Sequence, residues 1–252
     1  ADLFSAYQSI LTGSDFDTLD QAQKKSIENA IRDFRLSGID LPKNKQSRFA
    51  EISKRLSELS SQFSDNVLDA TMGWKKVVTD KSELSGLPEN ALGLARQMAE
   101  QNDEKGYLLT LDIPSYLPVL SYCENEKLRR EMYEAFVTRA SDQGPGKGQW
   151  DNSEIIHEIL TLRKERAELL GFRNFAELSL ATKMAQDTDQ VIGFLTELAE
   201  KSKPAAEKEF AAICEFAQNE FDVKEINAWD VNFYAEKLKE HRFSISEEKL
   251  RP

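Results

Sequence analysis

Apolar residues recur every three or four positions along most of the chain, which is the spacing of one face of an α-helix. The clearest stripe runs from Phe49 to Val67 at spacings of 3, 4, 3, 4 and 4. It consists of Phe49, Ile52, Leu56, Leu59, Phe63 and Val67. We therefore predict one long helix here, with this stripe packed against the core.

A preceding helix is predicted from its capping signals. Thr18-Leu19-Asp20-Gln21 has the form of a capping box, in which the Thr hydroxyl and the Gln side chain satisfy backbone donors. The helix carries three apolar residues at helical spacing, Ile27, Ile31 and Phe34. Gly38 suits the left-handed position after a helix end, so the helix is expected to stop there.

Two short segments have the composition of strands. Gly73 to Asp80 and Gly106 to Pro114 are rich in β-branched or aromatic residues and are bounded by Gly, Asp or Pro. We expect them to pair as a small antiparallel unit that lies on the helices, because two isolated strands are only marginally stable. A turn and one helix are predicted between them.

The remainder of the chain is predicted to be helical again. The expected helices are 115–122, 126–140, 150–171, 174–182, 188–201, 204–220 and 229–240. Ser141 to Ser153 is a Gly/Pro loop and the clearest internal break. Ser244 to Glu247 is a further capping-box pattern, yet the sequence stops at Pro252. A helix start without room for the helix predicts that the chain is truncated.

The net charge and the hydropathy of the chain disfavour some classes of binding partner. The net charge is −11, which disfavours nucleic acid and an anionic membrane surface as partners, since both need clustered Lys and Arg. No apolar run approaches the roughly 20 residues that span a bilayer. Cys123 and Cys214 are too few and too far apart for a disulfide framework or a metal knuckle. They are interpreted as buried free thiols of a cytoplasmic protein.

The segment His157-Glu158-Ile159-Leu160-Thr161 matches the zinc-protease pattern H-E-x-x-H except at its last position. Thr is a poor zinc ligand, and a catalytic zinc site uses three protein ligands. The sequence contains one other histidine, His241. The apolar neighbours of the motif predict a buried helix instead, with His157 as an ordinary helical residue. They are Ile155, Ile156, Ile159, Leu160, Leu162 and Leu169.

Other candidate chemistry has simpler interpretations. Gly144 to Gly148, GPGKG, lacks the Ser or Thr after Lys and the preceding strand that a phosphate-binding P-loop needs, so it is interpreted as a flexible connector. Paired carboxylates occur by chance among 44 acidic residues. The tryptophans are interpreted as packing anchors. No catalytic, cofactor-binding or metal-ligating residue is assigned.

The sequence resembles the thimet-oligopeptidase-like zinc metallopeptidases over almost all of its 252 residues. The most specific stretches are RDFRLSGIDLP, residues 32–42, and LGFRNFAELSLATKMA, residues 170–185. The resemblance implies a mainly α fold, namely one multi-helical lobe of a zincin-type oligopeptidase with a small two-stranded antiparallel β unit. Residues 1–113 would form the N-terminal helical region with the β unit. Residues 114–252 would begin the helical peptidase domain.

The resemblance also implies a function for the whole enzyme. Such enzymes are expected to be cytoplasmic zinc metalloendopeptidases that hydrolyse short peptides, including signal-peptide fragments, inside a narrow channel. Zinc would be held by an H-E-x-x-H helix and a further Glu, with the motif Glu as general base. Those residues lie beyond the point matching Pro252. This chain is therefore predicted to supply scaffold and channel wall, to bind no zinc and to be inactive alone.

Three hypotheses follow. The first is a fragment of a zinc oligopeptidase, with apolar surface left exposed for association. The second is a complete, non-catalytic helical interaction protein, which a stop codon after residue 252 would favour. The third is a stand-alone metal enzyme using His157, Glu158 and His241, which would require stoichiometric, tightly bound zinc.

Overall fold

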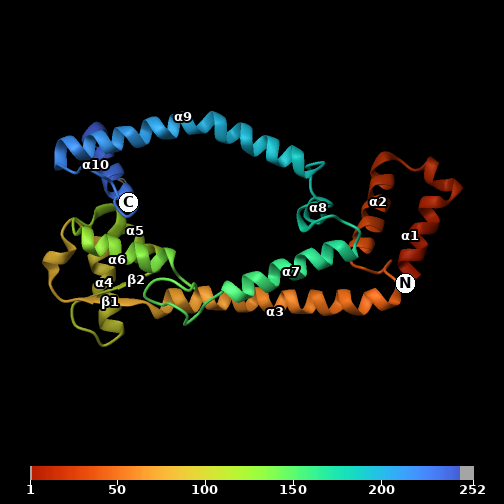
Figure 1. Cartoon of the computed structure of the whole chain (residues 1–252), viewed down its shortest axis with the longest axis horizontal. Coiled ribbons are helices and arrows are strands. Elements are labelled where there is room, and N and C mark those ends of the chain that lie inside the picture. Colours follow the sequence, from red (N-terminus) through yellow and green to blue (C-terminus); the bar gives the residue numbers. More distant parts are fainter. Residues whose placement is uncertain (1, 245–252) are drawn as a thin grey trace. The chain divides into compact units, whose positions relative to one another are not determined.

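The computed structural model describes residues 2–244, and contacts divide the chain into two compact units. Unit 1 combines Ala1–Gln62 with Ile155–Phe194, and unit 2 combines Phe63–Glu154 with Leu195–Pro252 (Figure 1). Within the described residues the fold is mainly helical with one two-stranded sheet, which confirms the predicted fold class. The capping box predicted at Ser244–Glu247 lies, from residue 245 on, outside the described residues.

Unit 1 begins with a helical hairpin. Its elements are α1 (Asp2–Thr12), the 3-10 helix η1 (Ser14–Thr18) and α2 (Gln21–Leu36). The hairpin core contains Phe4, Ile27 and Ile31, and the rings of Phe4 and Phe34 meet edge to face with centroids 5.7 Å apart. The sequence analysis missed α1.

The N-terminal cap predicted for α2 was wrong by two residues. Asp20, not Thr18, caps the helix: its carboxylate accepts a hydrogen bond from the Gln23 backbone N–H, and the Gln23 side chain accepts one from the Asp20 N–H. Thr18 is unavailable because it ends η1, where its hydroxyl donates to the Asp15 carbonyl. Two overlapping polar pairs at the same spacing compete here, and the preceding 3-10 turn selects the later one.

The C-terminal end of α2 confirms the role of Gly38. Its φ of +80° is the left-handed conformation that glycine adopts without a Cβ penalty. The Gly38 N–H donates to the Arg35 carbonyl and the Ile39 N–H to the Phe34 carbonyl, which is the Schellman pattern. A Cβ at residue 38 would also lie 2.8 Å from the Phe49 ring.

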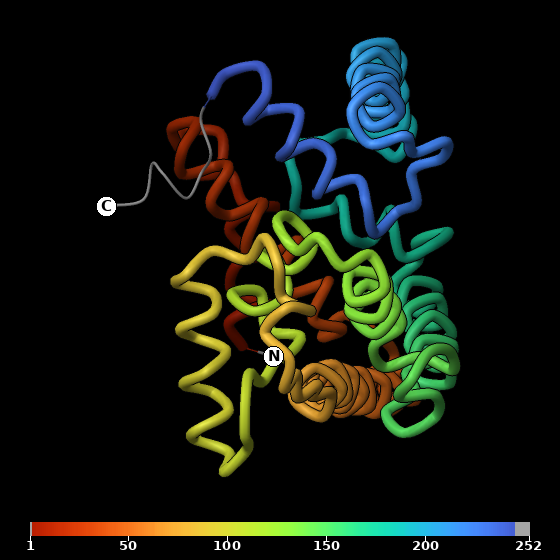
Figure 2. The backbone as a smooth tube through the Cα atoms, turned by 90° about the vertical axis from the view of Figure 1, so that its left-hand side faces the viewer, coloured from red at the N-terminus to blue at the C-terminus, as the bar shows by residue number. Residues whose placement is uncertain are grey.

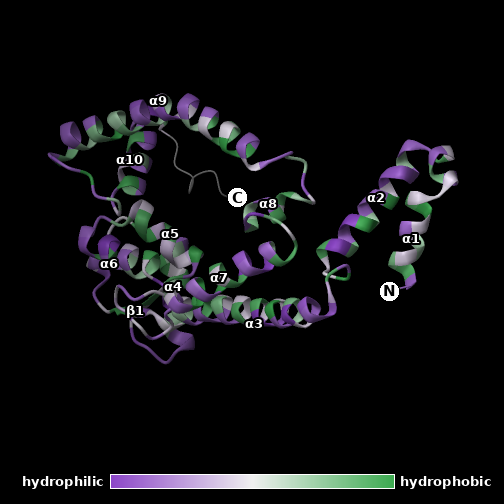
Figure 3. Cartoon of the chain, turned by 45° about the vertical axis from the view of Figure 1, so that its right-hand side comes forward, coloured by the Kyte–Doolittle hydropathy of each residue, from purple (hydrophilic) through white to green (hydrophobic). Residues whose placement is uncertain are grey.

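The predicted long helix is α3 (Lys43–Gly73), and the apolar stripe is its more buried side. Figure 3 shows the hydrophobic residues that this helix carries. Phe49, Ile52 and Leu59 are buried, and Leu56 is half-buried. Unit 1 also contains the greater part of α7 (Ser153–Leu169) and the short helix α8 (Phe175–Leu180).

Unit 2 holds the small sheet on a layer of helices. Its first elements are β1 (Lys75–Val78), η2 (Lys81–Leu84), α4 (Glu89–Gln101), β2 (Tyr107–Thr110), α5 (Ile113–Tyr122) and α6 (Glu126–Val137). In Figure 2 the chain can be followed from the orange α3 through β1 into the yellow α4. The strands pair antiparallel, with Lys75 opposite Thr110 and Val78 opposite Tyr107, as predicted. Val78 and Leu109 join the buried residues of α4, α5 and α6 in one core.

The last helices correct one prediction. The sequence predicts separate helices over 188–201 and 204–220, whereas the structure has one helix, α9 (Thr188–Phe221), with Pro204 in its interior. Proline removes one backbone donor and strains one turn, but the turns on either side of Pro204 keep their own hydrogen bonds. The chain then turns into α10 (Val231–Phe243).

Much of α9 is exposed within the part of the chain that the structure describes. Residues 195–211 are exposed throughout, and they include Leu195, Leu198 and Phe210. The helix becomes buried further on, where Ala217 packs with Phe233 and Tyr234 of α10. Within residues 2–244, no helix has both the length and the apolar character needed to cross a membrane.

Candidate functional site

The zincin-like segment lies on α7, as predicted, but α7 is only partly buried. Ile155, Ile159 and Leu162 are buried on one side, whereas Ile156 and Leu160 are 45% and 59% exposed. The expectation of a buried helix was therefore wrong for two of the six apolar residues, and a third, Leu169, is only half-buried. The helix is amphipathic, and the motif residues His157 and Thr161 lie on its exposed part.

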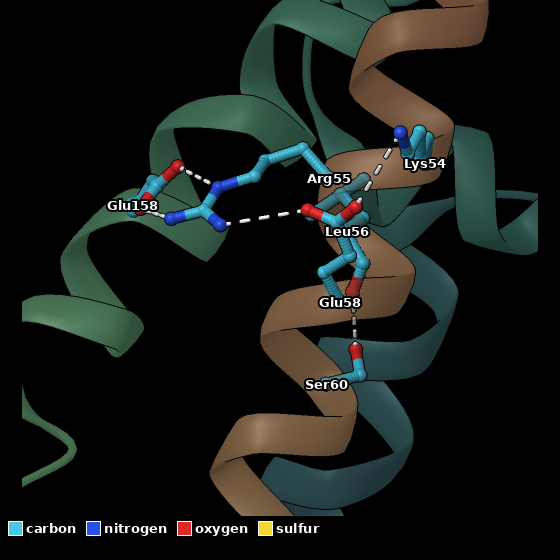
Figure 4. Close-up of polar contacts among 6 residues, drawn as sticks. All are labelled: Lys54, Arg55, Leu56, Glu58, Ser60 and Glu158. Atoms are coloured by element: carbon cyan, nitrogen blue, oxygen red, sulfur yellow. Dashed lines mark hydrogen bonds and ion pairs between the residues drawn. The ribbon is translucent and has the colours of Figure 1, made fainter.

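Two polar residues of the motif, Glu158 and Thr161, form hydrogen bonds within unit 1. The Thr161 hydroxyl donates to the His157 carbonyl one turn earlier on the same helix, at 2.9 Å. Both carboxylate oxygens of Glu158 accept hydrogen bonds from the Arg55 guanidinium on α3, at 2.6 and 2.7 Å (Figure 4). Arg55 also lies 3.6 Å from Glu58 on its own helix.

A second, similar ion pair lies further along the same two helices. Arg48 donates to both carboxylate oxygens of Glu165, at 2.6 and 2.7 Å. The arginines are seven residues apart on α3 and the glutamates seven apart on α7, in opposite order along the chain. Seven residues are two helical turns, so the two bridges fix an antiparallel register between the helices.

These bridges determine the electrostatics of Glu158. Its hydrogen bonds from Arg55 lower the pKa of the carboxyl group, and Arg48 lowers the pKa of Glu165 in the same way. A general base needs a free lone pair and a pKa near the working pH. Glu158 does not suit this role, because its pKa is lowered further from a neutral working pH and each of its oxygens already accepts a hydrogen bond from Arg55.

The metal donors of the described chain do not fit a zinc site. His157 is exposed on α7 in unit 1, and His241 lies on α10 in unit 2 with its ring centroid 5.3 Å from that of Phe216. Among residues 2–244, no three His, Cys, Asp or Glu side chains gather into a group that would hold a metal ion. No chemical step through zinc is therefore assigned to these residues.

The Gly/Pro loop before α7 is fastened at its end in unit 2. The Asn152 side chain is buried; its amide donates to the Phe63 carbonyl at 3.1 Å, and its oxygen accepts from Asn66 at 2.8 Å. The Asn152 backbone N–H donates to the Ala140 carbonyl. These bonds tie the loop to α3 and to the residues that follow α6.

A tryptophan completes the anchorage of this loop. A Cβ at Gly73 would lie 2.3 Å from the Trp150 ring, so glycine is needed for the ring to lie against the end of α3. This contact agrees with the interpretation of Trp150 as a packing anchor. The loop leads into α7 without the preceding strand of a P-loop, because α6 comes before it.

One buried ion pair was missed by the sequence analysis. Arg129 and Asp230 are 2% and 3% exposed, and the Arg129 Nη2 and Nε donate to Asp230 Oδ1 at 2.6 and 3.1 Å. Arg129 Nη1 donates to the carbonyl of Cys123, and the guanidinium lies 4.2 Å from the centroid of the Phe233 ring. A signal was present, because Arg129 lies between the apolar positions of α6.

Comparison with known proteins places this helical architecture in a family. The sequence profile of Peptidase family M3 matches residues 119–252, which is more than half of the chain. The chain belongs to peptidase family M3. A second profile, Neurolysin/Thimet oligopeptidase, N-terminal domain, matches residues 1–46 of this M3 chain.

Relatives of the M3 chain align along nearly its whole length. It is 58% identical to Oligopeptidase A of Salmonella typhimurium and 58% identical to Oligopeptidase A of Escherichia coli, each over 250 residues, or 99% of this chain. It is 40% identical to the Probable cytosolic oligopeptidase A of Arabidopsis thaliana over 259 residues. The chain spans 37% of the length of each bacterial relative.

Proposed function

We propose that this chain is part of a zinc metalloendopeptidase that hydrolyses short peptides, including fragments of signal peptides, in the cytoplasm. The observation that carries the proposal is the 58% identity to two bacterial proteins named Oligopeptidase A over 99% of this chain. Because the identity extends over nearly the whole chain and is not confined to one short motif, it supports a shared biochemical role. The net charge of −11 agrees with a protein that acts away from nucleic acid and anionic membrane surfaces.

In this proposal the chain supplies scaffold and one wall of a substrate channel, and the catalytic residues lie outside it. The fixed α3–α7 register and the fastened loop at Asn152 are features of a scaffold. Residues 1–113 and 114–252 are proposed as the N-terminal region and the start of the peptidase domain. The zinc ligands and the general base are proposed to lie in a segment of the whole enzyme beyond Pro252.

Reading the source gene past the codon for Pro252 is the first test. An open frame that reaches H-E-x-x-H and a further Glu is expected. A stop codon at that point would instead make the chain a helical interaction protein. The exposed side of α9, with Leu195, Leu198 and Phe210, agrees with the apolar surface expected of a fragment and would serve as the binding surface under this second candidate.

An activity measurement gives the second test. The protein encoded by the whole reading frame should cleave an internally quenched peptide of about ten residues, lose activity with a chelator and regain it with zinc. The 252-residue chain is the matched control and should cleave nothing. Cleavage by this chain, lost in Glu158→Gln, would contradict the proposal and support the third hypothesis.

A further inference from the structure

A cavity with an aromatic lining lies in unit 2, away from the zincin-like segment. It has a volume of about 390 Å³ and opens between the start of α6, the end of α9 and the outer side of α10. Three aromatic rings, of Phe221, Phe233 and Tyr234, meet edge to face along it, with centroid separations of 5.1 to 6.5 Å. Two carboxylates, Glu124 and Glu126, stand at its rim. The volume suits a small organic group.

The positive side chains of the cavity are already paired. Arg129 is neutralised by Asp230, at 2.6 Å, and is buried beneath the lining. Lys237 lies 3.6 Å from Glu240. The charge left over is therefore negative and belongs to the two rim glutamates.

The two glutamates differ in their surroundings. Glu124 accepts a hydrogen bond from the Ser85 hydroxyl, at 2.6 Å. This bond orients the Glu124 carboxylate but does not neutralise its negative charge. Glu126 has no hydrogen bond or ion pair with another described residue. Its carboxylate is therefore available to a ligand.

Tyr234 adds a hydrogen-bonding group to the cavity lining. The residue is only 7% exposed and lines the cavity, yet its hydroxyl makes no hydrogen bond with the described residues. A ligand or a water molecule in the cavity can therefore form a hydrogen bond with this hydroxyl. Burial raises the pKa of the Tyr234 phenol, so the group stays neutral and its oxygen can accept a hydrogen bond.

We propose that this cavity binds an organic cation, namely a guanidinium or ammonium group, between the Phe221 and Tyr234 rings and the Glu126 carboxylate. Aromatic faces attract such cations, and the Phe233 ring already has two of them nearby: Arg129 Cζ at 4.2 Å and Lys237 Nζ at 5.6 Å. The Phe221 ring is 43% exposed, which leaves a free aromatic surface for the ligand. The Tyr234 oxygen would accept a hydrogen bond from the cation.

A binding titration followed by NMR tests the proposal on the 252-residue chain. Nα-acetyl-arginine amide represents a peptide-borne guanidinium, methylguanidine a free guanidinium compound of the same charge, and Nα-acetyl-citrulline amide a neutral group of the same shape. Either cation should shift the signals of Phe221, Glu126 and Tyr234 to saturation, and the citrulline compound should not. Tighter binding of the arginine derivative would identify a peptide as the source of the cation, and tighter binding of methylguanidine a free small molecule.

Two variants distinguish binding at this cavity from nonspecific attraction of a cation to an acidic protein. Glu126→Gln should weaken binding at least about five-fold, because it removes the unpaired charge. Glu104→Gln removes an equal charge at an exposed position of unit 2 and should leave the affinity unchanged. Equal binding of the citrulline compound, or equal weakening by both variants, would overturn the proposal. This measurement needs no peptidase activity, so it stands apart from the test of the proposed function.

Discussion

Replacing Arg129 by Met tests how strongly the buried ion pair holds unit 2 together. The substitution retains most of the side-chain volume and removes the guanidinium. Asp230 Oδ1 then loses donors at 2.6 and 3.1 Å, and the Cys123 carbonyl loses one at 2.7 Å. The remaining side-chain donor to Asp230 is Asn227, at 3.4 Å. A carboxylate that is 3% exposed would therefore remain buried without an adequate partner.

The expected cost follows from that geometry. Breaking a buried ion pair by removing one partner costs about 3–5 kcal/mol, because the remaining charge stays desolvated. We expect Arg129→Met to lower the free energy of unfolding by that amount. In the double variant with Asp230→Asn both charges are gone, so its loss should be smaller than the sum of the two single losses by about 2 kcal/mol.

Urea unfolding followed by tryptophan fluorescence measures this effect in the right part of the chain. Trp74, Trp150 and Trp229 all belong to unit 2, so the signal reports the unit that contains the ion pair. The matched control is Arg96→Met, since Arg96 belongs to the same unit and pairs with Glu100 on the surface of α4. Exposed pairs of this kind contribute little, so the control should keep the wild-type midpoint.

Two results would refute this reasoning. A loss below about 1 kcal/mol in Arg129→Met would mean that Asp230 is solvated in the variant or finds another partner. Strictly additive single losses would mean that Arg129 and Asp230 act through different contacts. Either result would show that the Arg129–Asp230 ion pair does not hold α6 against α10.

Three further predictions concern acid stability, a helix end and thiol reactivity. The carboxyl pKa values of Glu158 and Glu165 are lowered by their arginines, so the unfolded chain binds more protons than the folded chain below the ordinary carboxyl pKa. The bridges should therefore stabilise the fold at neutral pH and lose their effect as the pH falls through about 4.3 and below; wild type should lose more stability between about pH 5 and pH 3 in circular-dichroism melts than the double variant with both residues changed to Gln. Gly38→Ala should destabilise unit 1 by about 1–3 kcal/mol because its φ is +80° and the space is filled, and a thermal melt within error of wild type would contradict this. Native protein should react with Ellman's reagent at Cys214 before Cys123, whose burial raises its thiol pKa, and equal rates for the two thiols would show that Cys123 is accessible.

Much of the fold could be predicted because it depends on local signals. The stripe on α3, the left-handed residue at Gly38 and the two strands each follow from a periodicity or a turn preference confined to a few neighbouring residues. The errors in the predicted helix ends arose where two local sequence signals compete. Two capping pairs overlap at the start of α2, and the α9 helix continues through Pro204 although proline usually ends a helix.

The contacts that matter most for the sites could not be predicted in this way. Arg129 and Asp230 are 101 residues apart, and Arg55 and Glu158 are 103 apart. In a chain with 44 acidic and 33 basic residues, a sequence offers many possible pairs at such distances and no means of choosing among them. The aromatic cavity has the same origin, since α6, α9 and α10 each contribute residues to it.

The zincin-like segment shows why residue types at a given spacing do not by themselves define a site. A zinc helix presents its two histidines, four residues apart, to the metal, with the intervening Glu free to act on water. On α7 the position of the second histidine is Thr161, whose hydroxyl bonds back to the helix, and Glu158 accepts hydrogen bonds from Nε and Nη2 of Arg55. Glu158 and Glu165 recur at seven residues, which is the spacing of one helix packed along another and not of metal ligands. Restoring a histidine at residue 161 would therefore not create a zinc site, because Arg55 would still occupy Glu158 and a third ligand would still be missing.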